Sequence, residues 1–181
     1  MLQPLEELEN FYQQEEDPWS YETTPDDAKR RSIIVSEIPE RSYRKVLDIG
    51  CGHGFVTREL PGEDILGVDI SNNAIKQAMK ISAHQSKAKR LRFLSASIFE
   101  LDAVLSETYD LVVITGVLYS QYIGESKTLV HQIVDKLLNA DGVLVCSHIN
   151  DWYSMRFPYL LLESYFFEYR EYTQRLEVYV K

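Results

Sequence analysis

Cysteine is scarce in this sequence, with only Cys51 and Cys146 among 181 residues. Two cysteines give neither the disulfide framework of a small secreted domain nor a zinc site, and we expect no metal and a reducing, cytoplasmic location. Long apolar runs are also missing, because no stretch approaches the roughly 18 residues that a membrane helix needs. The first ten residues are acidic where a signal peptide would be basic. We therefore expect no membrane partner.

Positive charge is in deficit too, since 19 Lys and Arg stand against 28 Asp and Glu and leave a net charge of −9. A phosphate backbone would repel such a chain, so a nucleic acid is not an expected partner. Hydrophobic residues make up 45% of the sequence, which is enough for a full core. The length predicts one domain with a modest appendage.

From about residue 43 onward, short apolar runs alternate with helical patterns and turn residues. The runs predict five strands, over residues 46–49, 65–70, 91–94, 111–115 and 143–149. Helices are expected between them, over residues 55–60, 71–83 and 125–138. This alternation predicts an α/β fold in which a doubly wound, parallel sheet carries helices on both faces.

The last thirty residues depart from that alternation. A helix is expected over 152–164, bent near Pro158, followed by strands over 166–172 and 176–180. Residues 173–175 are too few for a parallel return, so these strands must be antiparallel neighbours. The prediction is a seven-stranded, mostly parallel sheet that ends in a C-terminal antiparallel hairpin.

The first 42 residues differ in character and are rich in Glu, Asp, Gln and Tyr. Leu2, Leu5, Leu8 and Tyr12 recur at helical spacing. A second helix is expected from residue 26 or 27, where an aspartate can cap it, to residue 38, before a proline. We expect residues 1–42 to form a helical lid over a core of residues 43–181.

One segment carries the chemical signal. Residues 46–54 read Val-Leu-Asp-Ile-Gly-Cys-Gly-His-Gly, a buried strand that ends in a glycine-rich loop. Without a Cβ the loop can turn sharply and approach a ligand closely. Asp69 ends the next strand, where a carboxylate can accept two hydrogen bonds from ribose hydroxyls. A dinucleotide loop has the spacing Gly-x-Gly-x-x-Gly, which differs from this one.

Asp48 and the three glycines make the loop resemble the first motif of class I S-adenosylmethionine (SAM)-dependent methyltransferases, Asp-x-Gly-x-Gly-x-Gly. The resemblance implies the Rossmann-like methyltransferase fold and SAM as cofactor. It implies cofactor-binding roles for residues of the loop and of the following strand ends. These are Asp48, Gly50, Cys51, Gly52 and Gly54 at the cofactor backbone, Asp69 at the ribose, Ile70 on the adenine, and Ser97, Ile98 and Thr115. Ser97 stands where the family often has an acid that accepts from the adenine amine, and a neutral hydroxyl contributes less there.

The segment Asp17-Pro18-Trp19 before the first strand is weakly similar to the nodulation-type small-molecule N-methyltransferases, in which it belongs to a lid over the cofactor. Tyr12, Trp19 and Tyr21 are candidates for an aromatic lid, which suits a cationic or sugar-like acceptor. A hydrophobic staple that fixes the N-terminal helices to the sheet is the alternative role for Trp19.

His148 and Tyr119 are the candidate catalytic residues, because each lies at or just beyond the carboxyl end of a predicted strand. His148 can take a proton near neutral pH, and Tyr119 can orient an acceptor. The alternatives are that His148 only bonds a neighbouring loop and that Tyr119 only packs. His53, inside the glycine loop, is expected to point outward.

The favoured function is methyl transfer from SAM to nitrogen or oxygen of a small molecule such as an amine or sugar. A non-catalytic SAM-binding module and a nucleotide-dependent oxidoreductase are the alternatives. The sequence leaves the oligomeric state open.

Overall fold

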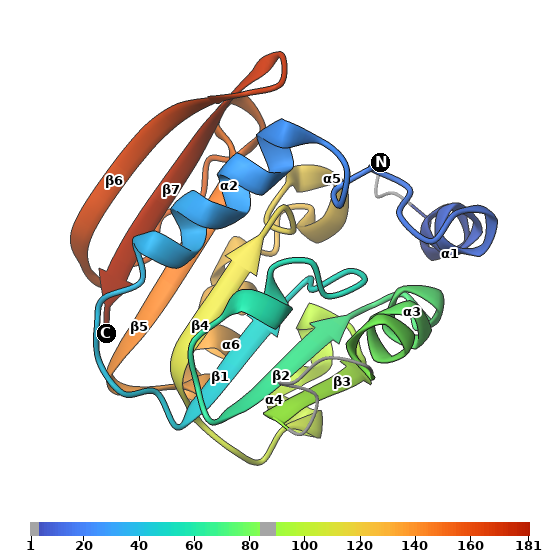
Figure 1. Ribbon diagram of the computed structural model, residues 1–181. Coiled ribbons are helices and arrows are strands. Elements are labelled where there is room, and N and C mark those ends of the chain that lie inside the picture. Colours follow the sequence, from blue (N-terminus) through green and yellow to red (C-terminus); the bar gives the residue numbers. More distant parts are fainter. Residues whose placement is uncertain (1–3, 84–89) are drawn as a thin grey trace.

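Seven strands form one sheet in the computed structural model, which describes residues 4–83 and 90–181 (Figure 1). The strands are β1 (Lys45–Ile49), β2 (Asp64–Asp69), β3 (Leu91–Ser95), β4 (Tyr109–Thr115), β5 (Leu138–Ile149), β6 (Leu160–Tyr169) and β7 (Tyr172–Val180). The helices are α1 (Leu5–Gln14), α2 (Pro25–Ser36), α3 (Asn72–Ser82), α4 (Leu101–Val104), α5 (Ser120–Ile123) and α6 (Lys127–Leu137). The predicted position of Leu2 in the first helix lies outside the described residues.

The strand order is β3-β2-β1-β4-β5-β7-β6. The first five strands are parallel, and β7 runs antiparallel to both of its neighbours. This confirms the predicted α/β sheet with a C-terminal antiparallel hairpin. Residues of β4 between 111 and 114 are completely buried because helices cover both faces of the sheet.

Two layers of helices cover the sheet. On one face, Ile34 of α2 and Ile38, which follows the helix, pack into a core that includes Val46, Val143 and Leu176. On the other, α6 packs onto a second core, and Figure 1 shows α2 and α6 on opposite sides of the strands. The second predicted helix therefore belongs to the covering layer of the sheet. The division of the chain at residue 42 into lid and core stays a prediction.

The predicted helix over 152–164 is wrong. A 3₁₀ turn spans Asn150–Trp152, and β6 occupies Leu160–Tyr169. The prediction failed because β6 lies at the edge of the sheet and is exposed along most of its length, so its apolar run lacks the alternation of a half-buried strand. The hairpin reverses at Arg170 and Glu171, rather than over 173–175 as predicted.

Parallel register brings several strand ends to one edge of the sheet. Ile49 pairs with Val68 on β2 and with Ile114 on β4, and Thr115 pairs with Ser147 on β5. Loops that follow these strands therefore meet above the same edge, where open α/β sheets bind ligands. Among the described residues, no helix is long and apolar enough to cross a membrane. The same residues hold no group of three His, Cys, Asp or Glu arranged for a metal ion.

Candidate active site

The glycine loop turns tightly between β1 and the following 3₁₀ turn. Gly50 and Gly52 have φ angles of +77° and +53°, a backbone region that favours glycine. A Cβ on Gly52 would lie 2.7 Å from the hydroxyl oxygen of Tyr12, so a side chain there would collide with helix α1. The N–H groups of Gly50 and Cys51 both donate to the carbonyl of Val68, which ties the loop to β2.

Asp69 holds the loop and the next helix together. Its Oδ2 accepts from the Gly52 N–H at 2.9 Å, and its Oδ1 accepts from the Ser71 N–H at 2.9 Å. Burial raises the pKa of this carboxyl, while the bonds from Ser71 and Gly52 oppose that rise. A carboxylate has about four lone-pair sites, so two remain for ribose hydroxyls.

The Glu9 side chain of helix α1 contacts the residues that follow Asp69. Glu9 accepts from the N–H groups of Asn72 and Asn73, at 2.7 and 3.1 Å, and from the Ser71 hydroxyl. These donors lie at the start of α3, where free N–H groups favour a carboxylate. This contact places α1 beside Asp69 and the start of α3.

Asp48 lies beneath the loop rather than in the cavity. It is completely buried, and its Oδ2 accepts from the Thr57 hydroxyl at 2.6 Å. Burial raises the pKa of Asp48 to about 7. Its Oδ1 is buried with no hydrogen-bond partner among the described residues. A cationic group bound above the loop would stabilise this carboxylate, so the site fits a ligand with a positive charge at that place.

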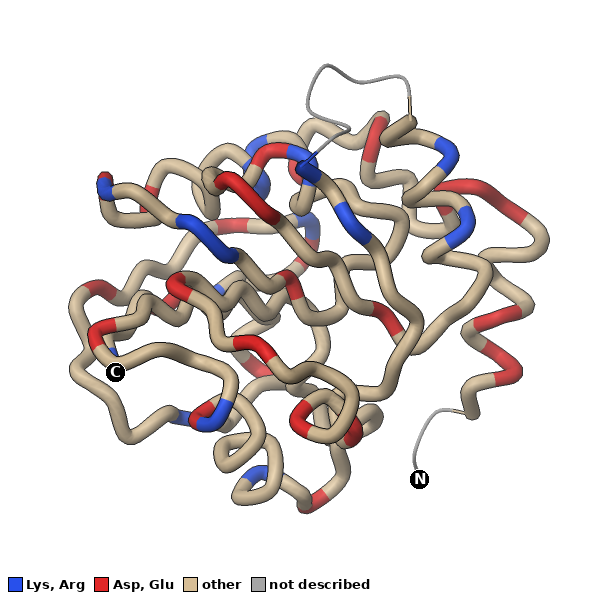
Figure 2. Tube along the Cα trace, turned by 90° about the horizontal axis from the view of Figure 1, so that it is seen from below, with Lys and Arg blue, Asp and Glu red and all other residues tan. Residues whose placement is uncertain are grey.

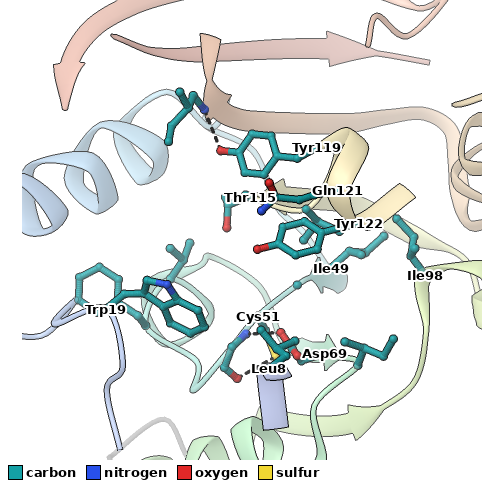
Figure 3. Close-up of a pocket in the computed structure, with 18 of the residues that line it drawn as sticks. Leu8, Trp19, Ile49, Cys51, Asp69, Ile98, Thr115, Tyr119, Gln121 and Tyr122 are labelled. Atoms are coloured by element: carbon teal, nitrogen blue, oxygen red, sulfur yellow. Dashed lines mark hydrogen bonds between the residues drawn. The ribbon is translucent and has the colours of Figure 1, made fainter. Parts of the chain in front are cut away.

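A cavity of about 610 Å³ opens above the glycine loop (Figure 3). Figure 3 shows Asp69 and Cys51 on one side of it and Tyr119 and Tyr122 on the other, with Trp19 closing a flank. Most of the predicted site residues line it: Gly50, Cys51, Gly52, Asp69, Ile70, Ser97, Ile98, Thr115 and Tyr119. The predicted residues that do not line it are Asp48, Gly54 and His148. Ser97 Oγ also accepts from the Phe99 N–H at 3.3 Å.

His148 does not line the cavity. Its side chain is fully buried, Nε2 accepts from the Leu118 N–H at 3.2 Å, and the ring stacks on Tyr153 at 4.3 Å between centroids. Burial and then the charge of Arg175 lower its pKa to about 3. These contacts do not fit a base that touches substrate, and they match the alternative in which His148 bonds a neighbouring loop.

Tyr119 lines the cavity, and its hydroxyl oxygen accepts from the Ile149 N–H at 2.9 Å. Burial raises its pKa to about 12, so the phenol stays protonated at neutral pH. The Tyr119 ring lies 5.6 Å from Trp152 and 6.1 Å from Tyr122. This arrangement suits orientation of an acceptor and not proton removal.

The predicted aromatic lid residues lie together. The ring of Trp19 is 5.2 Å from Tyr12 and 5.8 Å from Tyr21, and all three line the cavity. Tyr21 also stacks on His53 at 6.0 Å. The outward orientation expected for His53 is wrong, because its ring is fully buried and lies against Tyr21 and Phe55. The Glu22 carboxylate lies 3.3 Å from His53 Nε2.

Sequence reasoning missed a charged cluster that joins α2 to the β6–β7 hairpin. Asp27, expected only as a possible helix cap, is fully buried and accepts from Arg30, from the Tyr169 hydroxyl at 2.8 Å and from Arg170 at 2.7 Å. The Asp27-Arg30 spacing of three residues was the available signal, since it places both on one helix face. Arg30 lines the cavity, and its Nη1 makes no hydrogen bond to any described residue.

A parallel sheet with a glycine loop, a buried acid below it and a second acid at the next strand end defines a domain that binds an adenosyl cofactor at its carboxyl edge. A family model described as "Methyltransferase domain" matches residues 40–174. The chain belongs to this methyltransferase domain family. This assignment removes the support for an oxidoreductase, and it identifies the chain as a SAM-dependent methyltransferase domain.

Individual relatives differ in what they act on. The chain is 30% identical over 112 residues to the mitochondrial ubiquinone biosynthesis O-methyltransferase of Bos taurus, which covers 60% of this chain and 30% of that protein. It is 32% identical over 86 residues to the tRNA1(Val) (adenine(37)-N6)-methyltransferase of Yersinia enterocolitica. That match covers 45% of this chain and 34% of the relative. The chain thus spans about a third of the length of these two relatives.

The fold matches a solved structure over nearly its whole length. The crystal structure of the N-methyltransferase NodS from Bradyrhizobium japonicum WM9, in complex with S-adenosyl-L-homocysteine (SAH), has a TM-score of 0.78 and 19% identity. The match covers 98% of this chain and 97% of NodS. It extends through the N-terminal helices, which the family model leaves out.

Proposed function

We propose that the chain transfers a methyl group from SAM to nitrogen or oxygen of a small molecule. SAM, when bound, supplies a methyl group on a sulfonium that a nucleophile can attack. One observation carries the proposal: a single cavity is lined both by the glycine loop and by a roof from the two ends of the chain. Cofactor and acceptor would therefore share one enclosed space, as in-line transfer requires.

Each part of the cofactor would have a matching group in the cavity wall or, for Asp48, beneath it. Asp69 would hold the ribose hydroxyls, and Ile70 and Ile98 would pack on the adenine near Ser97. The free Nη1 of Arg30 would bind the carboxylate of the methionine part, and the buried charge of Asp48 would favour its ammonium. The backbone of residues 50–52 and the side chain of Thr115 would border the rest of the SAM molecule.

The composition of the roof supports the proposal of a small acceptor. The roof consists of side chains from α1, from residues 19–30, from the turn at Asn150–Trp152 and from the β6–β7 hairpin. A volume of about 610 Å³ is typical of a pocket for one or two small ligands. No inserted domain stands between β5 and the hairpin to grip a macromolecule.

Charge supports the same acceptor class. The net charge is −9, and in the view of Figure 2 Lys and Arg are interspersed with Asp and Glu along the trace. Tracking a nucleic-acid backbone requires a gathered basic surface. We also propose a cytoplasmic location, which the two buried, unpaired cysteines support.

Positioning is the chemical contribution of the protein. His148 lies outside the cavity and Tyr119 stays protonated, so neither supports early proton removal from an acceptor. An amine can attack through its lone pair and lose its proton afterwards, and a hydroxyl would pass its proton to water. Alignment alone can contribute on the order of 7–11 kcal/mol to such a transfer.

Two measurements test this function. Calorimetry with SAH should show binding that Asp69→Ala weakens, and a screen of amines, sugars and phenols for labelled methyl should yield an identified product. Binding of SAH without transfer to any acceptor would favour the non-catalytic module instead. Failure to bind SAH would contradict the proposal altogether.

A further inference from the structure

Gln174 has a buried side-chain amide, lines the cavity and has no part in the proposed binding of SAM. It lies near the start of β7, pairs in register with Ile149 and is only 2% exposed. Its Nε2 donates to the Ser147 hydroxyl at 3.0 Å. Its Oε1 is buried and has no hydrogen-bond partner among the described residues. An unmet acceptor of this kind is costly, so the missing donor calls for an explanation.

Aromatic rings line the same cavity as Gln174. Tyr172, two residues before Gln174, lies 5.0 Å from Trp152 between ring centroids, and Trp152 lies 5.6 Å from Tyr119. All three rings line the cavity, and Trp152 is 46% exposed. Flat walls of this type favour an aromatic ligand, which can pack edge to face or offset against them.

The position of Gln174 separates it from the cofactor end. Ser147, its partner, lies opposite Thr115 on β4, whereas Asp69 ends β2 on the far side of β1. Gln174 therefore lies on the β5–β7 side of the cavity, away from Asp69.

We propose that Gln174 determines acceptor specificity by accepting a hydrogen bond from the acceptor's O–H or N–H group while the rings of Trp152 and Tyr172 pack on its aromatic ring. This inference rests on the proposed function and narrows its acceptor class to phenols and arylamines. A site with an unmet acceptor rejects an analogue that lacks the donor, because the buried oxygen then stays unpaired.

Phenol and anisole probe the site, since they share a ring and differ in the donor. Their dissociation constants are measured by NMR titration with and without saturating SAH, in the wild type, in Gln174→Met and in Ser147→Ala. Gln174→Met keeps the length of the side chain but removes both the internal bond and the free oxygen. Ser147→Ala removes the internal bond alone and is the matched control.

The expected result is that Gln174→Met reduces the preference for phenol over anisole by roughly tenfold, whereas Ser147→Ala preserves it. An unchanged preference in Gln174→Met would overturn the assignment even where SAH binds normally. Loss of SAH binding by the wild type would refute the proposed function instead, and the probe ratio without SAH would still decide the role of Gln174.

A second variant keeps the test decisive should Gln174→Met fail to fold. Gln174→Glu retains an oxygen acceptor and adds charge. It should shift the preference between benzylammonium and benzyl alcohol towards the cation by about tenfold, because a charged acceptor bonds a cation more strongly. An unshifted preference would place Gln174 away from the bound ring and refute the proposal.

Discussion

Replacement of Asp48 by asparagine tests the electrostatics beneath the glycine loop. Burial raises the pKa of Asp48 from an ordinary value of 3.8 to about 7. Between these two values the folded chain holds a proton that the unfolded chain has released. The contribution of Asp48 to stability is therefore full below pH 3.8 and is lost as the pH rises to 7. The loss of unfolding free energy amounts to about 4 kcal/mol, because each unit of difference between the folded and unfolded pKa corresponds to about 1.4 kcal/mol.

Asp48→Asn removes this titration and keeps an oxygen that can accept from Thr57. The free energy of unfolding, measured by urea denaturation, should become larger in the variant than in the wild type. This difference should grow as the pH rises from 5 to 8. Groups far from Asp48 titrate equally in both chains and cancel in the difference. Asp141→Asn is the control, because Asp141 is exposed within β5 and has a φ of 60° that asparagine tolerates. Parallel pH profiles for wild type and Asp48→Asn would refute the reasoning.

Three further changes address the cofactor end. Asp69→Ala should weaken SAH binding by roughly 2–4 kcal/mol, because two hydroxyls lose a charged partner, and calorimetry showing unchanged affinity would contradict the ribose assignment. Gly52→Ala should destabilise the fold by about 1–2 kcal/mol in urea denaturation, because φ is +53° and the new Cβ would meet the Tyr12 hydroxyl at 2.7 Å. Arg30→Gln should weaken SAH binding roughly tenfold through loss of a charged hydrogen bond, and equal affinity would show that Arg30 does not meet the carboxylate.

The sheet and the cofactor loop were predictable because their signals are local. A run of buried β-branched residues such as 112–114 predicts a strand, and a glycine loop with an acid before it predicts a tight turn at its own position. The short spacing between the last strands was enough to predict an antiparallel hairpin. The limits of β6 were not predictable, because an exposed edge strand does not show which side is buried.

The acceptor end was less predictable, because its residues acquire their roles through contacts far along the chain. His148 follows a strand end in the sequence, yet its ring turns onto Tyr153 and the loop at Leu118. Gln174 was expected in a turn and instead lies within β7, against Ser147. Only the pairing of β5 with β7 brings that amide to the cavity.

The Asp27 carboxylate joins parts of the chain that lie 142 and 143 residues apart, through Tyr169 and Arg170. During synthesis the glycine loop emerges long before these partners exist. The nucleoside side of the pocket can thus take shape early, whereas the chamber for the acceptor closes only after residue 170 has been added. If the proposed function holds, a nascent chain would accordingly bind SAM before it has any specificity for a methyl acceptor.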